Sequence, residues 1–226
     1  MPIYKRINKN FFKKWSHKMA YVTGFFAADG YITANKRGAN FWNIKICDKD
    51  LLYKIRNCIG SEHKIGVRKH KNINAKLQYC LQIGSKEMCN DLRSLGFSEN
   101  KTKSLVVPNI PDRYLAAFVR GYFDGDGNVW VGYTHKERIN KLCVIRSVFT
   151  SCSLNFLETI KMKLEKFYIC KGVVSKGKGN YYRLTYSIHN SLKLYNFMYN
   201  KRAFNTKDLF LARKKKVFES YVKLRL

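Results

Sequence analysis

Two acidic residues, Asp29 and Asp126, stand in the same local sequence 97 positions apart (126 − 29), and each precedes a glycine at the end of an apolar run. The two runs are Tyr21–Gly30 and Leu115–Gly127. Carboxylates bind hard divalent cations, and the free carbonyl groups at a helix end would add oxygen ligands. Those carbonyls belong to Ala28 and Gly125. The repeated pattern therefore predicts two sites suited to Mg²⁺.

Each run carries small residues four positions apart, namely Gly24 with Ala28 and Gly121 with Gly125. Residues at this spacing share one helix face, so two such helices could pack with their backbones close together. We expect helices over 17–28 and 112–125, each stopped by a left-handed glycine. A carboxylate at a helix C-terminus is disfavoured by roughly 0.3–1 kcal/mol because it lies at the negative end of the helix dipole. A cation bound to the carboxylate would make this interaction with the dipole favourable. One Gly-Asp-Gly is usually a turn, but two copies after apolar helical runs indicate a site.

Both copies resemble the LAGLIDADG motif of homing endonucleases, whose last Asp-Gly pair falls on Asp29 with Gly30 and on Asp126 with Gly127. The resemblance is to the branch with two motifs in one chain, and it covers nearly the whole sequence. It implies an α+β fold of two tandem αββαββα halves, whose antiparallel sheets form a saddle over DNA while the motif helices pack at the centre. It also implies metal-dependent hydrolysis of both strands, with one Asp serving each strand.

The chain is strongly basic, with 44 Lys and Arg against 15 Asp and Glu and a formal net charge of +29. Positive residues are spread from Lys5 to Arg225 rather than gathered in a tail, so a folded surface is expected to carry the charge. Nucleic acid is the natural polyanionic partner of such a surface. A ribosomal or general RNA-coating protein is the alternative that the charge alone leaves open.

The seven cysteines include no Cys-x-x-Cys pair and predict neither a disulfide framework nor a zinc site. They are typical of reduced residues in an intracellular protein. No stretch approaches the ~18 apolar residues of a membrane span, and the Lys-rich start lacks the apolar run of a secretion signal. We expect no membrane association, and a location in the bacterial or archaeal cytoplasm or in an organelle, either mitochondrion or chloroplast.

Other segments repeat at nearly the same spacing as the motifs. Leu52–Ile55 matches Leu157–Ile160 at an offset of 105, and Thr102–Leu105 matches Thr206–Leu209 at an offset of 104. Apolar residues alternate with polar ones in the strand-like stretches. In the first half we expect strands at 31–37 and 41–47, a helix at 49–58, strands at 64–70 and 76–83, and a helix at 86–95. In the second we expect strands at 128–135 and 142–150, a helix at 153–167, strands at 171–176 and 181–188, and helices at 191–199 and 206–223.

The boundary between the halves is expected around 106–111, because Pro108 and Pro111 cannot continue a helix. This gives an N-terminal half of 1–107 and a C-terminal half of 108–226. In the strand at 181–188, Tyr182, Leu184, Tyr186 and Ile188 are expected to face inward.

An antiparallel sheet with a polar, basic face suits the major groove of a DNA duplex, which admits β-ribbons and presents a distinct pattern for every base pair. Arg and Lys suit guanine, and Asn and Gln suit adenine. The candidate DNA-binding residues in the first half are Asn35, Arg37, Asn43, Lys45, Arg68, His70, Lys76 and Gln78. Those in the second half are Trp130, Thr134, Arg146, Lys176, Lys178 and Arg183.

The resemblance implies a basic residue beside each metal, and the repeat comparison points to Lys103 and Lys207, with Lys101 and Lys214 as competitors. Two departures from the family pattern stand out. Ala27 replaces a second acid that the other copy keeps as Asp124, which affects helix-end stability more than chemistry. Cys47 and Cys152 stand near the ends of the second strands, where relatives often carry Gln or another polar residue. One water-ordering contact would then be missing.

The expected activity is that of a monomeric, magnesium-dependent DNA endonuclease, a hydrolase acting on ester bonds. It would cut both strands within a roughly palindromic site of about 20 base pairs and leave short 3′ overhangs. Mn²⁺ is expected to replace Mg²⁺, and Ca²⁺ to permit binding without cleavage. No segment resembles an intein, so an intron-borne or free-standing gene is favoured. The alternative is an intron RNA maturase or a DNA-binding regulator that uses the same fold without cutting.

Overall fold

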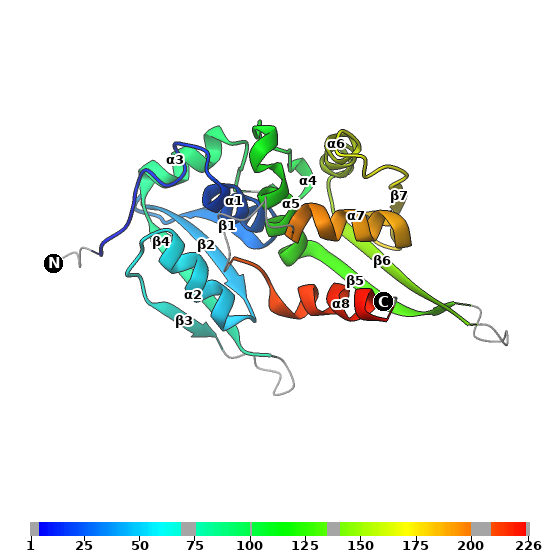
Figure 1. Ribbon diagram of the computed structural model, residues 1–226. Helices are drawn as coiled ribbons and strands as arrows, with labels where there is room; N and C mark the ends of the chain where they lie inside the picture. The colour runs from blue at the N-terminus through cyan, green and yellow to red at the C-terminus, as the bar shows by residue number, and fades with distance from the viewer. Residues whose placement is uncertain (1–4, 69–75, 100, 135–140, 200–208, 225–226) are drawn as a thin grey trace.

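The computed structural model describes residues 5–68, 76–99, 101–134, 141–199 and 209–224, without the side chains of 101 and 102. Two four-stranded antiparallel sheets flank a central pair of helices, α1 (His17–Asp29) and α5 (Asp112–Asp126), which lie side by side (Figure 1). Each half follows the order αββαββα, which confirms the predicted α+β fold of two tandem repeats. None of the described helices is long and apolar enough to cross a membrane.

The first sheet has the strand order β1-β2-β4-β3. After α1, its half contains β1 (Gly30–Ala34), β2 (Asn40–Ile46), α2 (Lys49–Cys58), β3 (Ile65–Arg68), β4 (Gln78–Gly84) and α3 (Lys86–Ser94). The observed bounds of α2 are those expected from the sequence. A single turn, α4 (Lys101–Ser104), was not expected and lies before the segment in which the domain boundary is predicted.

The second sheet repeats this arrangement with the order β5-β6-β8-β7. After α5, its half contains β5 (Gly127–Thr134), β6 (Leu142–Ser151), α6 (Leu154–Glu165), β7 (Val173–Lys176), β8 (Tyr182–Tyr186), α7 (Ile188–Tyr199) and α8 (Ala212–Lys223). Ile188 packs against the core as predicted, but its predicted place in the strand was wrong. This residue begins α7 rather than ending the strand, because the carbonyl of Ser187 already accepts a helical hydrogen bond from the Ser191 N–H at 2.8 Å.

Polar side chains begin four of these helices. Ser16 accepts a hydrogen bond from the Met19 N–H at 3.1 Å and caps α1. The same contact recurs at the helices that follow a strand pair, where the caps are Asp48, Ser85 and Ser153. Such a cap satisfies a backbone donor that has no partner within the helix. The local sequence therefore determines where these helices start.

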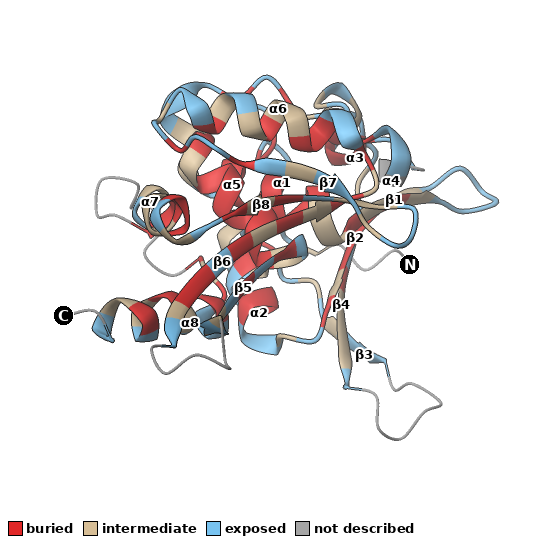
Figure 2. Ribbon diagram, turned by 90° about the vertical axis from the view of Figure 1, so that its right-hand side faces the viewer, coloured by how far each residue is buried: buried red, intermediate tan, exposed pale blue. Residues whose placement is uncertain are grey.

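Each sheet buries one face against helices because strand side chains alternate. In the first sheet Ile32, Trp42 and Ile83 lie opposite one another across three strands, and all are buried. In the second sheet Val129, Ser147 and Tyr186 form the equivalent row and are also buried. Figure 2 shows how residues along β6 change between buried and exposed. The opposite face of each sheet is called here the open face; it carries Tyr31, Asn43 and Lys45 in the first sheet and Trp130, Arg146 and Val148 in the second.

The two central helices pack backbone against backbone. A Cβ atom at Gly24 would overlap the carbonyl oxygen of Phe118, and a Cβ atom at Gly121 would overlap that of Tyr21. In addition, every residue of α1 from Met19 to Ala27 is buried. The small residues predicted from their spacing therefore form the contact between the halves.

The helices end at Asp29 and Asp126 as predicted, but the conformation expected for the following glycines was wrong. Gly30 has φ −89° and Gly127 has φ −87°, so both are extended rather than left-handed. Glycine is required for space, since a Cβ atom at either position would enter the ring of Phe26 or Phe123. The chain consequently passes straight from each acid into the first strand of its sheet.

A buried polar cluster ties α1, α5 and α8 together. Asp124 accepts hydrogen bonds from the Tyr21 hydroxyl at 2.7 Å and from the Leu211 N–H at 2.9 Å. Burial raises the pKa of Asp124 to about 6, although these two hydrogen bonds favour the charged form and act to lower it. The matching residue of the first half, Ala27, is also buried but carries no charge.

Replacing either interface glycine is expected to separate the helices. Gly24→Ala and Gly121→Ala would each force a methyl group into a backbone carbonyl and should lower the free energy of unfolding by about 1–3 kcal/mol or more. Chemical denaturation measures this change. Gly66→Ala is the control, because its added Cβ meets only the Cys80 carbonyl at an ordinary 3.8 Å. Equal effects at all three positions would contradict close helix packing.

The buried carboxyl predicts a specific pH dependence of stability. Because the folded pKa of Asp124 lies above its ordinary value of 3.8, the folded protein binds the proton more tightly, and this contribution to stability falls between about pH 4 and pH 6. The slope is at most about 1.4 kcal/mol per pH unit. In metal-free buffer, the difference between wild type and Asp124→Asn should fall across this window and then level off. A difference that is flat from pH 4 to pH 6 would contradict the raised pKa.

Candidate active site

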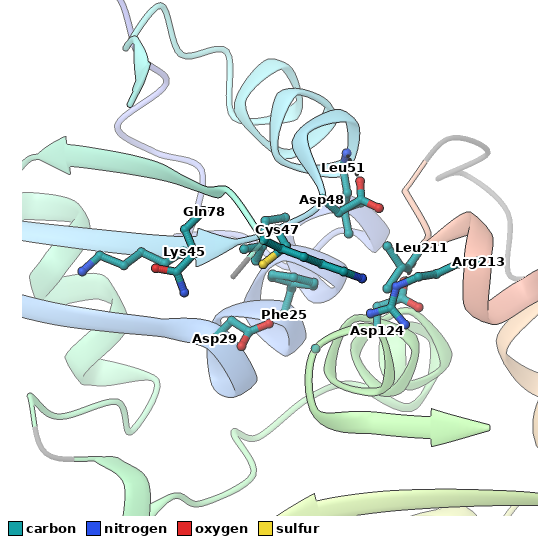
Figure 3. Close-up of a pocket in the computed structure, with 13 residues that line it drawn as sticks. Phe25, Asp29, Lys45, Cys47, Asp48, Leu51, Gln78, Asp124, Leu211 and Arg213 are labelled. Atoms are coloured by element: carbon teal, nitrogen blue, oxygen red, sulfur yellow. Dashed lines mark hydrogen bonds between the residues drawn. The ribbon is translucent and has the colours of Figure 1, made fainter. Parts of the chain in front are cut away.

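The acids at the two helix ends lie in separate pockets. Asp29 lines a cavity of about 560 Å³, together with Gly125 of the other central helix and Cys47 beyond the end of β2. Figure 3 shows Asp29 next to Phe25 in this cavity. The equivalent cavity of about 250 Å³ is lined by Asp126, Ala28 and Cys152. Each pocket thus joins the acid of one half to the helix end of the other.

The two helix ends are in direct contact at these pockets. A Cβ atom at Gly125 would overlap the Cβ of Ala28 and lie 3.1 Å from the Asp29 Oδ2 atom. The structure therefore brings together all four residues that were predicted as metal ligands. It pairs them across the interface, Asp29 with Gly125 and Asp126 with Ala28.

The donors around each pocket fit a hard cation that keeps much of its hydration. No three His, Cys, Asp or Glu side chains within the described ranges are placed to hold a metal ion. Each pocket offers one carboxylate and the backbone of a helix end, which are oxygen donors of the type that Mg²⁺ prefers. Mg²⁺ commonly binds through one or two carboxylates, with water and substrate phosphates completing its shell. These pockets fit that pattern better than a protein-only metal site.

Lys214 interacts directly with the end of α5. Its ammonium group donates to the carbonyls of Phe123 and Asp124 at 2.7 Å and to that of Gly125 at 3.1 Å. Burial lowers the pKa of Lys214 to about 8. The cation neutralises the negative end of the helix dipole close to both acids. The Gly125 carbonyl, predicted as a metal ligand, is therefore shared with a lysine.

This helix-end role of Lys214 was not predicted, although the residue was one of the competing lysines. The sequence feature that could have revealed this role is the spacing of Lys214 from Phe218 and Tyr221, which follow it by four and seven residues on α8. This spacing places all three on one face of the helix, and all three are buried. Lys103 is exposed on α4, two residues before Leu105, which lines the smaller pocket. Lys207 and the side chain of Lys101 lie outside the described residues.

On the first sheet, the register places Asn43, Lys45, Gln78 and Arg68 on the open face. Lys45, Lys76 and Gln78 also line the larger pocket. Arg37 is exposed in the turn after β1. Two candidates differ from expectation. Asn43 is only 1% exposed and donates to the Thr33 hydroxyl at 3.2 Å, while Asn35 accepts from two backbone N–H groups and builds the turn. His70 lies outside the described residues.

On the second sheet, Trp130, Arg146 and Arg183 lie on the open face. Thr134 is at the end of β5, where its hydroxyl donates to the Leu142 carbonyl at 3.3 Å. Lys176 differs from expectation. It pairs with Tyr182, which places it on the helix-covered side of the sheet because alternate strand residues point to opposite faces. Lys178 is exposed in the turn after β7.

Comparison with solved structures identifies similar folds at low sequence identity. The LAGLIDADG meganuclease I-AabMI bound to uncleaved DNA is 17% identical, with a TM-score of 0.59 over 90% of this chain and 88% of that chain. Mesophilic variants of the homing endonuclease I-DmoI are 15% identical, with a TM-score of 0.58 over 83% and 93%. The I-SmaMI LAGLIDADG homing endonuclease bound to cleaved DNA is 13% identical, with a TM-score of 0.55 over 93% and 89%. These similarities show a shared fold.

A stretch of 100 residues is 36% identical to the probable translation initiation factor IF-2 of Thermococcus kodakarensis. It includes 42% of this chain but spans only 7% of that protein, so the similarity carries no activity over. A family model described as a LAGLIDADG-like domain matches residues 16–95 and, separately, residues 113–198. Together these segments cover well over half of the chain, with one match in each half. The chain therefore belongs to the LAGLIDADG family, in the form that carries two copies of the domain in one polypeptide.

Proposed function

We propose that this protein is a monomeric, magnesium-dependent endonuclease that cuts both strands of a specific DNA site and leaves short 3′ overhangs. The observation that carries the proposal is the placement of Asp29 and Asp126 in two separate pockets, each of which also includes the helix end of the other half. Two pockets related in this way suit two phosphodiester bonds, one on each strand. Solved structures of the same fold include endonucleases bound to uncleaved and to cleaved DNA.

The residues of each pocket have distinct tasks in this proposal. Asp29 and Asp126 would hold Mg²⁺ with the helix-end carbonyls of Gly125 and Ala28. A bound divalent ion activates water for attack on phosphorus and stabilises the leaving oxygen. Mn²⁺ can take the same oxygen ligands. Lys214 holds the α5 carbonyls at fixed positions and places a positive charge at the end of this helix.

Further basic groups are proposed beside the two acids. Lys103 is our candidate beside Asp126, because Leu105 places that segment at the smaller pocket. Lys207 is its counterpart from the repeat. Arg213 lines the larger pocket with Asp29 and adds a cation that the sequence did not single out. A basic side chain at each pocket would neutralise charge that develops on the phosphate during hydrolysis.

The open faces of the two sheets would bind the major groove on either side of the cut. The longest strand, β6, has 10 residues. At ~3.3 Å per residue it spans ~33 Å, or nearly ten base pairs at ~3.4 Å, so two sheets cover about 20 base pairs. The net charge of +29 favours a polyanion over this area. The alternative, a maturase or regulator without cleavage, uses the same faces but has no need of two acidic pockets.

Binding and cleavage are tested together by selection from random duplexes. Duplexes retained in calcium are transferred to magnesium, and the new ends are sequenced. Wild type should produce breaks at the centre of one enriched motif of about 20 base pairs. Asp126→Asn should abolish cleavage or leave a nick in one strand, with binding in calcium unchanged, because it removes one metal-holding carboxylate.

The matched control for this experiment is Asp112→Asn, which neutralises an exposed acid at the opposite end of the same helix. It should cut like wild type. Double-strand cleavage by Asp126→Asn at the wild-type rate would eliminate the proposed site. An enriched motif that wild type leaves intact in magnesium would indicate a regulator, and no enriched DNA at all would favour intron RNA.

Arg183 provides a separate test of the DNA-facing side. It is exposed on the open face of the second sheet, where its guanidinium contacts the Tyr181 hydroxyl at 2.9 Å. Arg183→Ala should weaken binding of one half-site by about 1–3 kcal/mol if the side chain contacts a guanine. Competition between duplexes altered in one half-site at a time measures this effect. A uniform loss for all sequences would instead indicate a phosphate contact.

A further inference from the structure

The open faces of the two sheets have different chemistry, although their backbones correspond. The buried row Gly30–Ile44–Leu81 in the first sheet matches Gly127–Phe149–Leu184 in the second. The neighbouring residue on each of these strands points to the open face, so the open-face rows of the two sheets can be compared position by position. They read Tyr31–Asn43–Gln82 in the first sheet and Asn128–Val148–Thr185 in the second.

At two of the three positions in this row the second sheet has β-branched residues in place of amides, while Asn128 stands where the first sheet has Tyr31. Where the first sheet has Asn43 and Gln82, the second has Val148 and Thr185, and the row continues through Val173 on β7. Val173 is 63% exposed. Three β-branched side chains thus lie next to one another on adjacent strands.

Trp130 on β5 adds a further exposed apolar side chain to the same open face, two residues along the strand from Asn128. It is 46% exposed, stands opposite Arg146, and corresponds to Thr33 of the first sheet. A Cβ atom at Gly132 would enter the Trp130 ring, so the indole lies over that glycine. A large aromatic surface exposed to water in this way is typical of an interaction site. We call the set Trp130, Val148, Val173 and Thr185 the methyl-facing patch.

Charge identifies the partner of this patch as DNA. Arg146 and Arg183 lie on the same open face, on the strands that carry Val148 and Thr185. In the major groove, the one apolar group presented by the bases is the 5-methyl group of thymine, which apolar side chains recognise by contact. On the first sheet the amide of Gln82 is exposed, whereas Asn43 is only 1% exposed, and an exposed amide suits adenine through paired hydrogen bonds.

We propose that the two halves recognise DNA by different chemistry. The second sheet reads its half-site largely through thymine 5-methyl groups, whereas the first sheet reads its half-site through hydrogen bonds. This rests on the proposed DNA-binding function and adds to it the base composition of one half-site: the half-site under the methyl-facing patch is rich in thymine, on either strand. The expected symmetry of the target is correspondingly low.

Uracil substitution tests this inference directly. Deoxyuridine keeps the pairing edge and O4 acceptor of thymine but lacks the methyl group. The duplex enriched from the random library is prepared with deoxyuridine in one half-site at a time, and Kd is measured in calcium. Arg68→Ala and Arg183→Ala, one on each sheet, assign the half-sites. Uracil in the second half-site should weaken binding about fourfold for each thymine methyl group that is removed, and uracil in the first less than twofold.

Variants connect that effect to the patch. Trp130→Ala should remove the preference for thymine over uracil at the positions it contacts, without changing the first half-site. Met162→Ala is the matched control, because it removes an exposed apolar side chain from α6 and should leave the preference intact. Equal uracil effects in both half-sites, no uracil effect, or a second half-site without thymine would overturn the inference while leaving a DNA-binding endonuclease in place. Failure to enrich or cleave any duplex would instead overturn the proposed function.

Discussion

The backbones of α1 and α5 touch where Gly24 meets Phe118 and Gly121 meets Tyr21, and the geometry of the candidate site follows from this contact. Any larger side chain there would move the helix axes apart. The ends of the helices would separate with them, and Asp29 would lose its place beside Gly125. Because Gly30 and Gly127 continue directly into strands, the same contact also sets the positions of the two sheets. One backbone interface thus determines both the pockets and the surfaces that flank them.

The halves share a topology but differ in the polar groups at the centre. In the second half Asp124 binds Tyr21 of the first half and the backbone before α8, and Lys214 of α8 covers the carbonyls of α5. In the first half Ala27 occupies the corresponding place and can form no such bonds. A buried charged group costs free energy unless it is hydrogen-bonded, so this cluster specifies one orientation of α8 against the central helices. The two pockets consequently have different volumes and different basic neighbours.

Much of the fold could be predicted because its signals are local. Alternation in β2 and β8, the small residues of the motif helices, and the Asp-Gly pairs each depend on a few neighbouring residues. The remaining features depend on contacts distant in sequence. Lys214 is buried because α8 folds back onto α5, Asn43 is covered although it lies on the open face, and Lys176 follows the register of β7 with β8. The sequence identified the glycines after the two acids as structurally important. The physical cause is different from the one expected, because the rings of Phe26 and Phe123 occupy the space that a Cβ atom would need.

Each pocket combines an acid from one half with a helix end from the other, whereas each open face belongs to one half alone. Selection therefore acts on the two layers separately. A substitution on a sheet face alters the preference for one side of a target and leaves the chemistry and the other side unchanged. A substitution at the central helices affects both pockets at once. The sheet faces can therefore diverge one half at a time, whereas exchange of halves between relatives succeeds only where their central helices remain compatible.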